Sequence, residues 1–167
     1  KTLLMQGCRV LFVRCFDLLP RCPVKDMFGL SYAASREDQL DACLFCLDNS
    51  RRVLDQYGLD YIDLREFADD ALIEACRKNV PTGDADRFGF HYKSVNVGRL
   101  AFYDFAIANK HPVELELNAG DRSKLDAYIL NAVIAIELFD RLRTEVPVAS
   151  LVCFDVYAMM LSVRLRA

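Results

Sequence analysis

The chain has 167 residues, of which 53% are hydrophobic and 27% are charged, a composition typical of a globular domain and not of a disordered segment. Its formal net charge of −3 argues against a nucleic-acid partner, because binding a phosphate backbone needs a basic face. No apolar run reaches the roughly 18 residues of a membrane-spanning helix, so we expect no transmembrane segment.

The cysteines indicate a reducing compartment. There are seven of them, an odd number, and several lie in apolar runs. Secreted disulfide frameworks are instead short, loop-rich and usually even-numbered. We therefore expect reduced thiols in a cytoplasmic protein.

The first elements follow from apolar runs and capping signals. Residues 8–16 form a short run rich in β-branched residues and Phe, which is typical of a strand buried on both faces. Prolines and a glycine predict a loop over 17–34. Ser35 and Asp38 have the spacing of a capping box, and Gly58 suits a helix C-terminus, so a helix is predicted between them.

The rest of the chain is richer in helices than in strands. In chain order we expect a strand at 59–64, helices at 65–79 and 94–109, a linker at 110–120, a helix at 122–146 capped by Asp121, a strand at 148–154 and a helix from 157 to the end. The expected buried face of the helix 65–79 consists of Phe67, Leu72, Ile73 and Cys76. In the helix 94–109, Leu100, Tyr103 and Ile107 lie on one stripe.

This order of elements predicts an α/β fold. Alternating strands and helices indicate a Rossmann-like parallel sheet with crossover helices, and the helix-rich middle reads as a helical insertion. We expect residues 1–167 to form a single domain. Because the chain begins at Lys1 and stops within an expected helix, we also expect a fragment of a longer two-domain protein.

Four cysteines form the first candidate site. Cys43 and Cys46 have zinc-ligand spacing, and Cys15 and Cys22 precede them, so the four thiolates are candidate ligands of a structural zinc ion. A purely structural reading is that they are small buried apolar residues, since Cys43 and Cys46 share a helix face with leucines. A redox pair is disfavoured, because Cys43 lies about two turns inside its helix.

The ends of the strands form the second candidate site. Ligands of open α/β sheets bind outside the carboxyl ends of the strands. Asp17 follows the first strand and Asp155 follows the third, so the two carboxylates could face one crevice. The alternative is that both residues cap turns or helices.

The segment 91–99 forms the third candidate site. It places His91, Tyr92, Lys93, Asn96 and Arg99 around Gly98 at a helix start, where an anion could bind. The alternative is that these polar residues are solvated. Gly98 within a helix costs about 1 kcal/mol relative to Ala, so either the helix begins there or another group approaches the backbone closely.

The order of these motifs resembles the N-terminal region of bacterial capsule and surface-polysaccharide glycosyltransferase-like proteins. The resemblance covers about residues 8–155. Its motifs are Asp17-Leu-Leu-Pro-Arg-Cys22, the C-x-x-C of Cys43 and Cys46, Gly58-Leu-Asp-Tyr-Ile-Asp-Leu64, and Tyr92-Lys-Ser-Val-Asn-Val-Gly-Arg99.

The resemblance implies the first half of a glycosyltransferase B-type fold, at most peripheral to the inner membrane. This half would bind the glycan acceptor, and the absent half would bind the nucleotide-sugar donor. Asp17 or Asp155 would act as general base on the acceptor hydroxyl, with Tyr92, Lys93, Gly98 and Arg99 contacting substrate. The chain departs from the pattern after the third strand, where Asp155-Val-Tyr157 replaces an expected Asn-Gly-Arg.

Two hypotheses of function follow. The first is the acceptor-side domain of a glycosyltransferase-like protein of surface polysaccharide biosynthesis, with little or no activity by itself. The second is a non-catalytic, cysteine-rich metal-binding or protein-interaction module.

Overall fold

The chain divides into two compact units, Lys1–Ala68 and Asp69–Ala167, and each has its own buried core. A computed structural model describes residues 5–7, 10–15, 17–30, 34–83, 85–110 and 116–147. The predicted strand at 148–154, Asp155 and the predicted last helix lie outside these residues.

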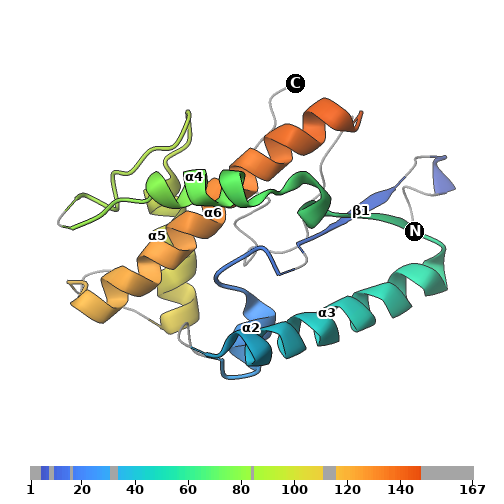
Figure 1. The fold of residues 1–167 in the computed structure, drawn as a ribbon, viewed down its shortest axis with the longest axis horizontal. Helices are drawn as coiled ribbons and strands as arrows, with labels where there is room; N and C mark the ends of the chain where they lie inside the picture. The colour runs from blue at the N-terminus through green and yellow to red at the C-terminus, as the bar shows by residue number, and fades with distance from the viewer. Residues whose placement is uncertain are drawn as a thin grey trace. The chain divides into compact units, whose positions relative to one another are not determined.

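The first unit is built on one strand–helix–strand connection (Figure 1). Strand β1 pairs in parallel with β2, and Val13 lies opposite Ile62 in the register. The long helix α3 connects the two strands, as parallel pairing requires. The elements are β1 (Leu11–Arg14), α2 (Pro23–Met27), α3 (Arg36–Tyr57), β2 (Asp60–Asp63) and the short 3-10 helix η1 (Leu64–Phe67).

Local capping chemistry sets both ends of α3. The Ser35 side chain accepts a hydrogen bond from the backbone N–H of Asp38, and its hydroxyl donates to the Asp38 carboxylate at 2.6 Å. Gly58 ends the helix in the left-handed conformation, at φ 60°. The caps at Ser35 and Gly58, and the strand that follows Gly58, confirm the sequence prediction.

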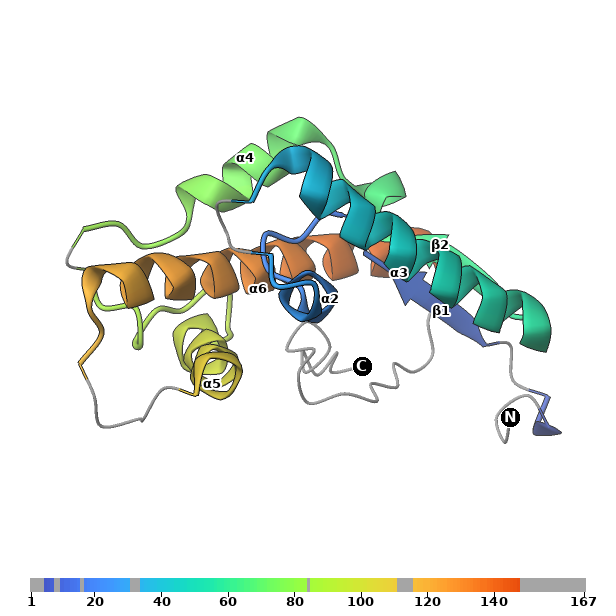
Figure 2. The same cartoon turned by 90° about the horizontal axis from the view of Figure 1, so that it is seen from below.

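The described part of the second unit contains three helices, α4 (Asp70–Lys78), α5 (Val97–Asn109) and α6 (Ala119–Glu145). Figure 2 shows α4 and α5 on opposite sides of α6. Helix α6 buries thirteen side chains between Leu125 and Leu142. A helix that is apolar on most of its sides belongs in the centre of a core. No helix in the described residues has the length and apolarity needed to cross a membrane.

The Rossmann-like prediction is wrong. The described residues contain a two-stranded parallel sheet, and most of the described chain is helical. The predicted helical insertion is instead the core of the second unit, where α4 and α5 pack on α6 rather than on a sheet. Short apolar runs suggest strands that could share a sheet, but their periodicity says nothing about which elements pack together.

Several helix boundaries differ from the prediction because polar capping residues set them. The predicted helix 65–79 is interrupted, since Asp69 caps α4 after the separate turn η1. Helix α6 begins at Ala119, because Asn118 is its cap and its side chain accepts from the N–H of Asp121. The predicted loop 17–34 contains the short helix α2. Tyr103, which shares the predicted stripe of the helix 94–109, is 55% exposed.

Candidate functional site

Asp17 stands at the centre of a polar network beside the carboxyl end of β1. Its side chain is 1% exposed, and its backbone has φ 59°, a left-handed conformation that Asp adopts more readily than most residues. Oδ1 accepts a hydrogen bond from Lys25 Nζ at 2.9 Å and one from Cys43 Sγ at 3.2 Å. Oδ2 forms an ion pair with Arg36. Asp17 therefore links β1 to both α2 and α3.

Lys25 is the buried cation of this network. Besides Asp17, its Nζ donates to the backbone carbonyl of Leu19 and to Oε1 of Gln39, both at 3.3 Å. An ammonium group has three donors, and here each has an acceptor. Lys25 was not predicted from the sequence, because an isolated Lys in a predicted loop normally reads as solvated.

The network keeps Asp17 ionised. Burial by itself would raise the pKa of the Asp17 carboxyl, but the hydrogen bonds from Lys25 and Cys43 and the charges of Lys25 and Arg36 lower it below its usual value. A general base works best with a pKa near the operating pH. The geometry therefore favours an anchoring role for Asp17 over the predicted role as a base.

The four cysteines predicted as zinc ligands gather near this network. Burial, followed by the charge of Cys22, raises the pKa of Cys15 to about 11. Burial and the hydrogen bond to Asp17 raise the pKa of Cys43 to about 12. Burial and the charge of Cys22 also raise the pKa of Cys46. The thiols therefore lie close enough together for the charge of one to raise the pKa of another.

The thiols do not form a metal centre as they are placed. Among the described residues, no three His, Cys, Asp or Glu side chains are arranged to hold a metal ion. The described cysteines, Cys15, Cys22, Cys43, Cys46 and Cys76, form no disulfide. Zinc binding therefore stays a prediction, and the raised pKa values of Cys15 and Cys43 keep these two thiols protonated near neutral pH.

The segment predicted to bind an anion is docked on α6. Tyr92 and Val95 exchange backbone hydrogen bonds of 2.9 and 3.1 Å, and the turn between them places Lys93 at φ 50°. The Tyr92 hydroxyl donates to Glu137 Oε1 at 2.6 Å. Lys93 Nζ lies 2.8 Å from Glu137 Oε1 and 2.5 Å from Asp140 Oδ2. Two carboxylates thus compete with any anion for this lysine.

Position 98, at the start of α5, has no room for a side chain. A Cβ on Gly98 would collide with the backbone carbonyl of Arg87 and lie 2.8 Å from that of Phe88. Its N–H donates to the carbonyl of Phe90 at 2.9 Å. Both parts of the sequence prediction are confirmed, because α5 begins at Val97 and another segment approaches its backbone closely.

The remaining polar groups of this segment also have partners within the second unit. The Asn96 side chain caps α5 by accepting from the N–H of Arg99 at 2.9 Å. The Arg99 guanidinium lies 5.6 Å from the centre of the Phe88 ring. The structure brings Tyr92, Lys93, Gly98 and Arg99 together, and each of them has a contact that holds the local fold.

A second feature of the first unit is an apolar surface on α2 and α3, absent from the sequence analysis. The rings of Phe28 and Phe45 pack edge to face with centroids 5.2 Å apart. Both rings are about half exposed, and Met27 is 82% exposed. Together with Leu40 and Leu44, which are also exposed, these residues form what we call the α2–α3 apolar face.

Comparisons of this chain with known protein families, with curated proteins and with solved structures find no match. The glycosyltransferase-like resemblance, its nucleotide-sugar and glycan ligands and the bacterial surface-polysaccharide role therefore stay predictions.

Proposed function

We propose that the chain is a non-catalytic protein-interaction module that binds its partner through the α2–α3 apolar face. The observation that carries this proposal is the pair Phe28 and Phe45, whose rings pack on each other while about half of each stays exposed. Adjacent large apolar side chains on a surface mark interaction sites more often than single ones do.

The composition of the face suits the centre of an interface. Aromatic residues and Met are enriched there, and the face contains two Phe side chains and Met27. Fully burying one large apolar side chain contributes about 1.5–3 kcal/mol. Covering several half-exposed side chains at once would therefore supply a substantial part of the free energy of association.

The Asp17 network supports this role by holding the two helices of the face in place. Lys25 belongs to α2, whereas Arg36 and Cys43 belong to α3, and all three contact the same carboxylate. A surface whose parts are already fixed loses less conformational entropy on binding. The buried network thus gives the exposed face a defined shape.

A selection of displayed random peptides on the full chain tests the proposal. Wild type should enrich peptides with apolar residues at helical spacing, the pattern that grooves and helix faces bind. Phe45→Ser should lose this enrichment, because it removes the exposed ring that packs on Phe28. The matched control is Tyr103→Ser, which removes a similarly exposed ring from α5 in the second unit.

Circular dichroism of the three proteins must first show equal helix content. Enrichment that depends on Phe45 and not on Tyr103 supports an interaction module. Peptides that bind wild type and Phe45→Ser equally, or no enrichment at all, would overturn the proposal.

A further inference from the structure

We propose that the partner segment is a basic amphipathic helix, which rests on the interaction role proposed above. The α2–α3 apolar face is accompanied by a row of acidic side chains on the exposed side of α3. The row consists of Glu37, Asp41 and Asp48, all of them exposed.

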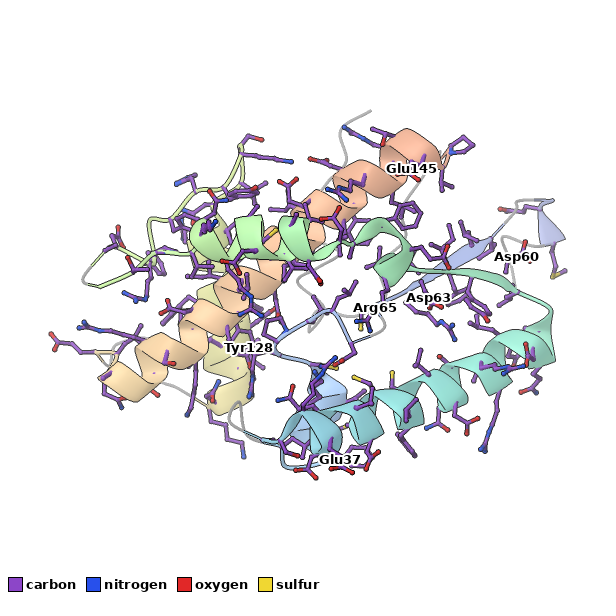
Figure 3. All side chains as sticks on the ribbon, viewed as in Figure 1. Glu37, Asp60, Asp63, Arg65, Tyr128 and Glu145 are labelled. Atoms are coloured by element: carbon purple, nitrogen blue, oxygen red, sulfur yellow. The ribbon has the colours of Figure 1, made fainter. Side chains whose placement is uncertain are left out.

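Helix geometry places these acids beside the apolar side chains. Residues three and four apart are neighbours on a helix surface. Asp41 is three residues before Leu44 and four before Phe45, and Asp48 is four residues after Leu44 and three after Phe45. One carboxylate therefore lies one helical turn before Leu44 and Phe45, and another lies one turn after them. Glu37 extends the row into the first turn of α3 (Figure 3).

The nearby cations do not cancel this charge. Lys25 is buried and Arg36 is ion-paired, and both contact Asp17. Arg52 pairs with Asp48 at the far end of the row, and within the described part of the chain Glu37 and Asp41 have no paired cation. Between residues 37 and 48 of α3, every charged side chain is therefore acidic.

Helix stability does not account for the whole row. Carboxylates in the first turn of a helix stabilise it through the macrodipole, but the effect falls off beyond that turn. Glu37 lies in the first turn, whereas Asp41 and Asp48 lie deeper in α3. Asp48 has an ion pair with Arg52 within α3, and Asp41 is the acid whose position an external cation explains best.

This pattern fits a helix that has apolar residues on one side and Lys or Arg along their margins. Its apolar side would cover Phe28, Leu44 and Phe45, and its cations would reach Asp41 and Glu37. Charges at the rim of an interface set partner choice and association rate more than they set affinity. They are also screened by salt, with a Debye length of about 10 Å at 0.1 M.

Two synthetic peptides test the charge preference on the full chain. Both carry the same leucine pattern at helical spacing, one with lysines and the other with glutamates at the remaining positions, and binding is followed by fluorescence anisotropy. We expect the lysine peptide to bind more tightly at low salt and to lose affinity as salt rises. Phe45→Ser should weaken it strongly.

The matched charge variants are Asp41→Asn and Asp55→Asn, which remove one exposed carboxylate each from α3. Asp41→Asn should weaken the lysine peptide about threefold, a typical effect of one exposed ion pair. Asp55→Asn should leave it nearly unchanged, because Asp55 lies two turns beyond Asp48 and pairs with Arg51.

The outcomes separate this inference from the proposed function. If the glutamate peptide binds as tightly as the lysine peptide, and both depend on Phe45, the basic partner is overturned while the interaction module stands. If the lysine peptide binds Phe45→Ser as well as wild type, its binding is general charge attraction, and the inference is overturned. If neither peptide binds and peptide selection also fails, both proposals are overturned.

Discussion

Lys25 Nζ donates a hydrogen bond of 2.9 Å to Asp17 Oδ1, and the two side chains are only 7% and 1% exposed. A charged pair this deeply buried contributes little net stability relative to apolar residues, but loss of one partner leaves an uncompensated charge. The pair therefore makes the arrangement of β1, α2 and α3 sensitive to a single substitution.

The first prediction concerns the removal of Asp17. Asp17→Ala should lower the free energy of unfolding by about 3–5 kcal/mol, because it leaves the buried Lys25 ammonium without its anion. Urea unfolding followed by circular dichroism measures this loss. The comparison is Asp48→Ala, which breaks the exposed pair with Arg52 and should cost about 0.2–1 kcal/mol. Equal losses in the two variants would contradict a key role for Asp17.

The second prediction concerns the loss of stability at low pH. The pKa of Asp17 is below its usual value in the folded state, so the unfolded chain binds a proton at a higher pH than the folded chain does. Its contribution to stability is therefore complete above the unfolded pKa of about 3.9 and is lost as pH falls through the folded pKa. Asp17→Asn should flatten the pH dependence of the unfolding free energy in this window. If Asp17→Asn leaves the pH dependence unchanged, the network does not lower the pKa of Asp17.

The third prediction concerns the reactivity of Cys43. The pKa of this thiol is about 12, because of burial and the hydrogen bond to Asp17. Alkylation by iodoacetamide requires the thiolate, so its rate at Cys43 should rise about tenfold per pH unit up to the alkaline limit of the fold. In urea the rate should level off above pH of about 9, since an unperturbed thiol has pKa about 8.5. Mass spectrometry of the Cys43 peptide gives both curves, and an early plateau in the folded protein would contradict the raised pKa.

The fourth prediction concerns Gly98. Gly98→Ala should destabilise the second unit by about 3 kcal/mol or more, because the new Cβ meets backbone carbonyls that cannot rotate away. Gly120→Ala is the matched substitution in α6, where the nearest atom is the Asn118 side-chain oxygen at 3.2 Å. It should lie within about 1 kcal/mol of wild type, since Ala favours a helix more than Gly does. Thermal unfolding of both variants measures the difference.

The fifth prediction concerns the contact between the 92–95 turn and α6. Burial and the hydrogen bond to Glu137 raise the pKa of Tyr92 to about 12. Glu137→Gln removes the negative charge, so the pKa of Tyr92 should fall toward its usual value of about 10. Ultraviolet titration of the phenolate, with Tyr92→Phe subtracted to remove the other tyrosines, isolates this group. An unchanged pKa in Glu137→Gln would mean that burial alone causes the shift.

The parts of the fold that were predicted from sequence are those that depend on local chemistry. Helix α3 and its caps at Ser35 and Gly58 follow from side-chain-to-backbone hydrogen bonds within a few residues. Strand β2 follows directly after the glycine turn. The close backbone approach at Gly98 was also predictable, since a glycine inside a helix needs a reason.

The parts that failed depend on contacts between distant residues. The buried partner of Asp17 is Lys25, and the partners of Lys93 are Glu137 and Asp140, more than forty residues away in the chain. Spacing cannot reveal such pairs, so Lys93 read as a solvated or anion-binding residue. Likewise the amphipathic periods of α4, α5 and α6 do not show that these helices pack on one another rather than on a sheet.

The sequence alone determined the two ends of α3, the position of β2 and the close spacing of Cys43 and Cys46 within α3. Tertiary structure alone decided that helices form the second core, that Asp17 is an anchor with two cationic partners, and that Phe28 and Phe45 meet on an exposed surface. The physical reason is the distance along the chain between the residues that interact. Caps and turns are decided by hydrogen bonds between near neighbours, whereas ion pairs and apolar contacts form wherever the folded chain brings side chains together.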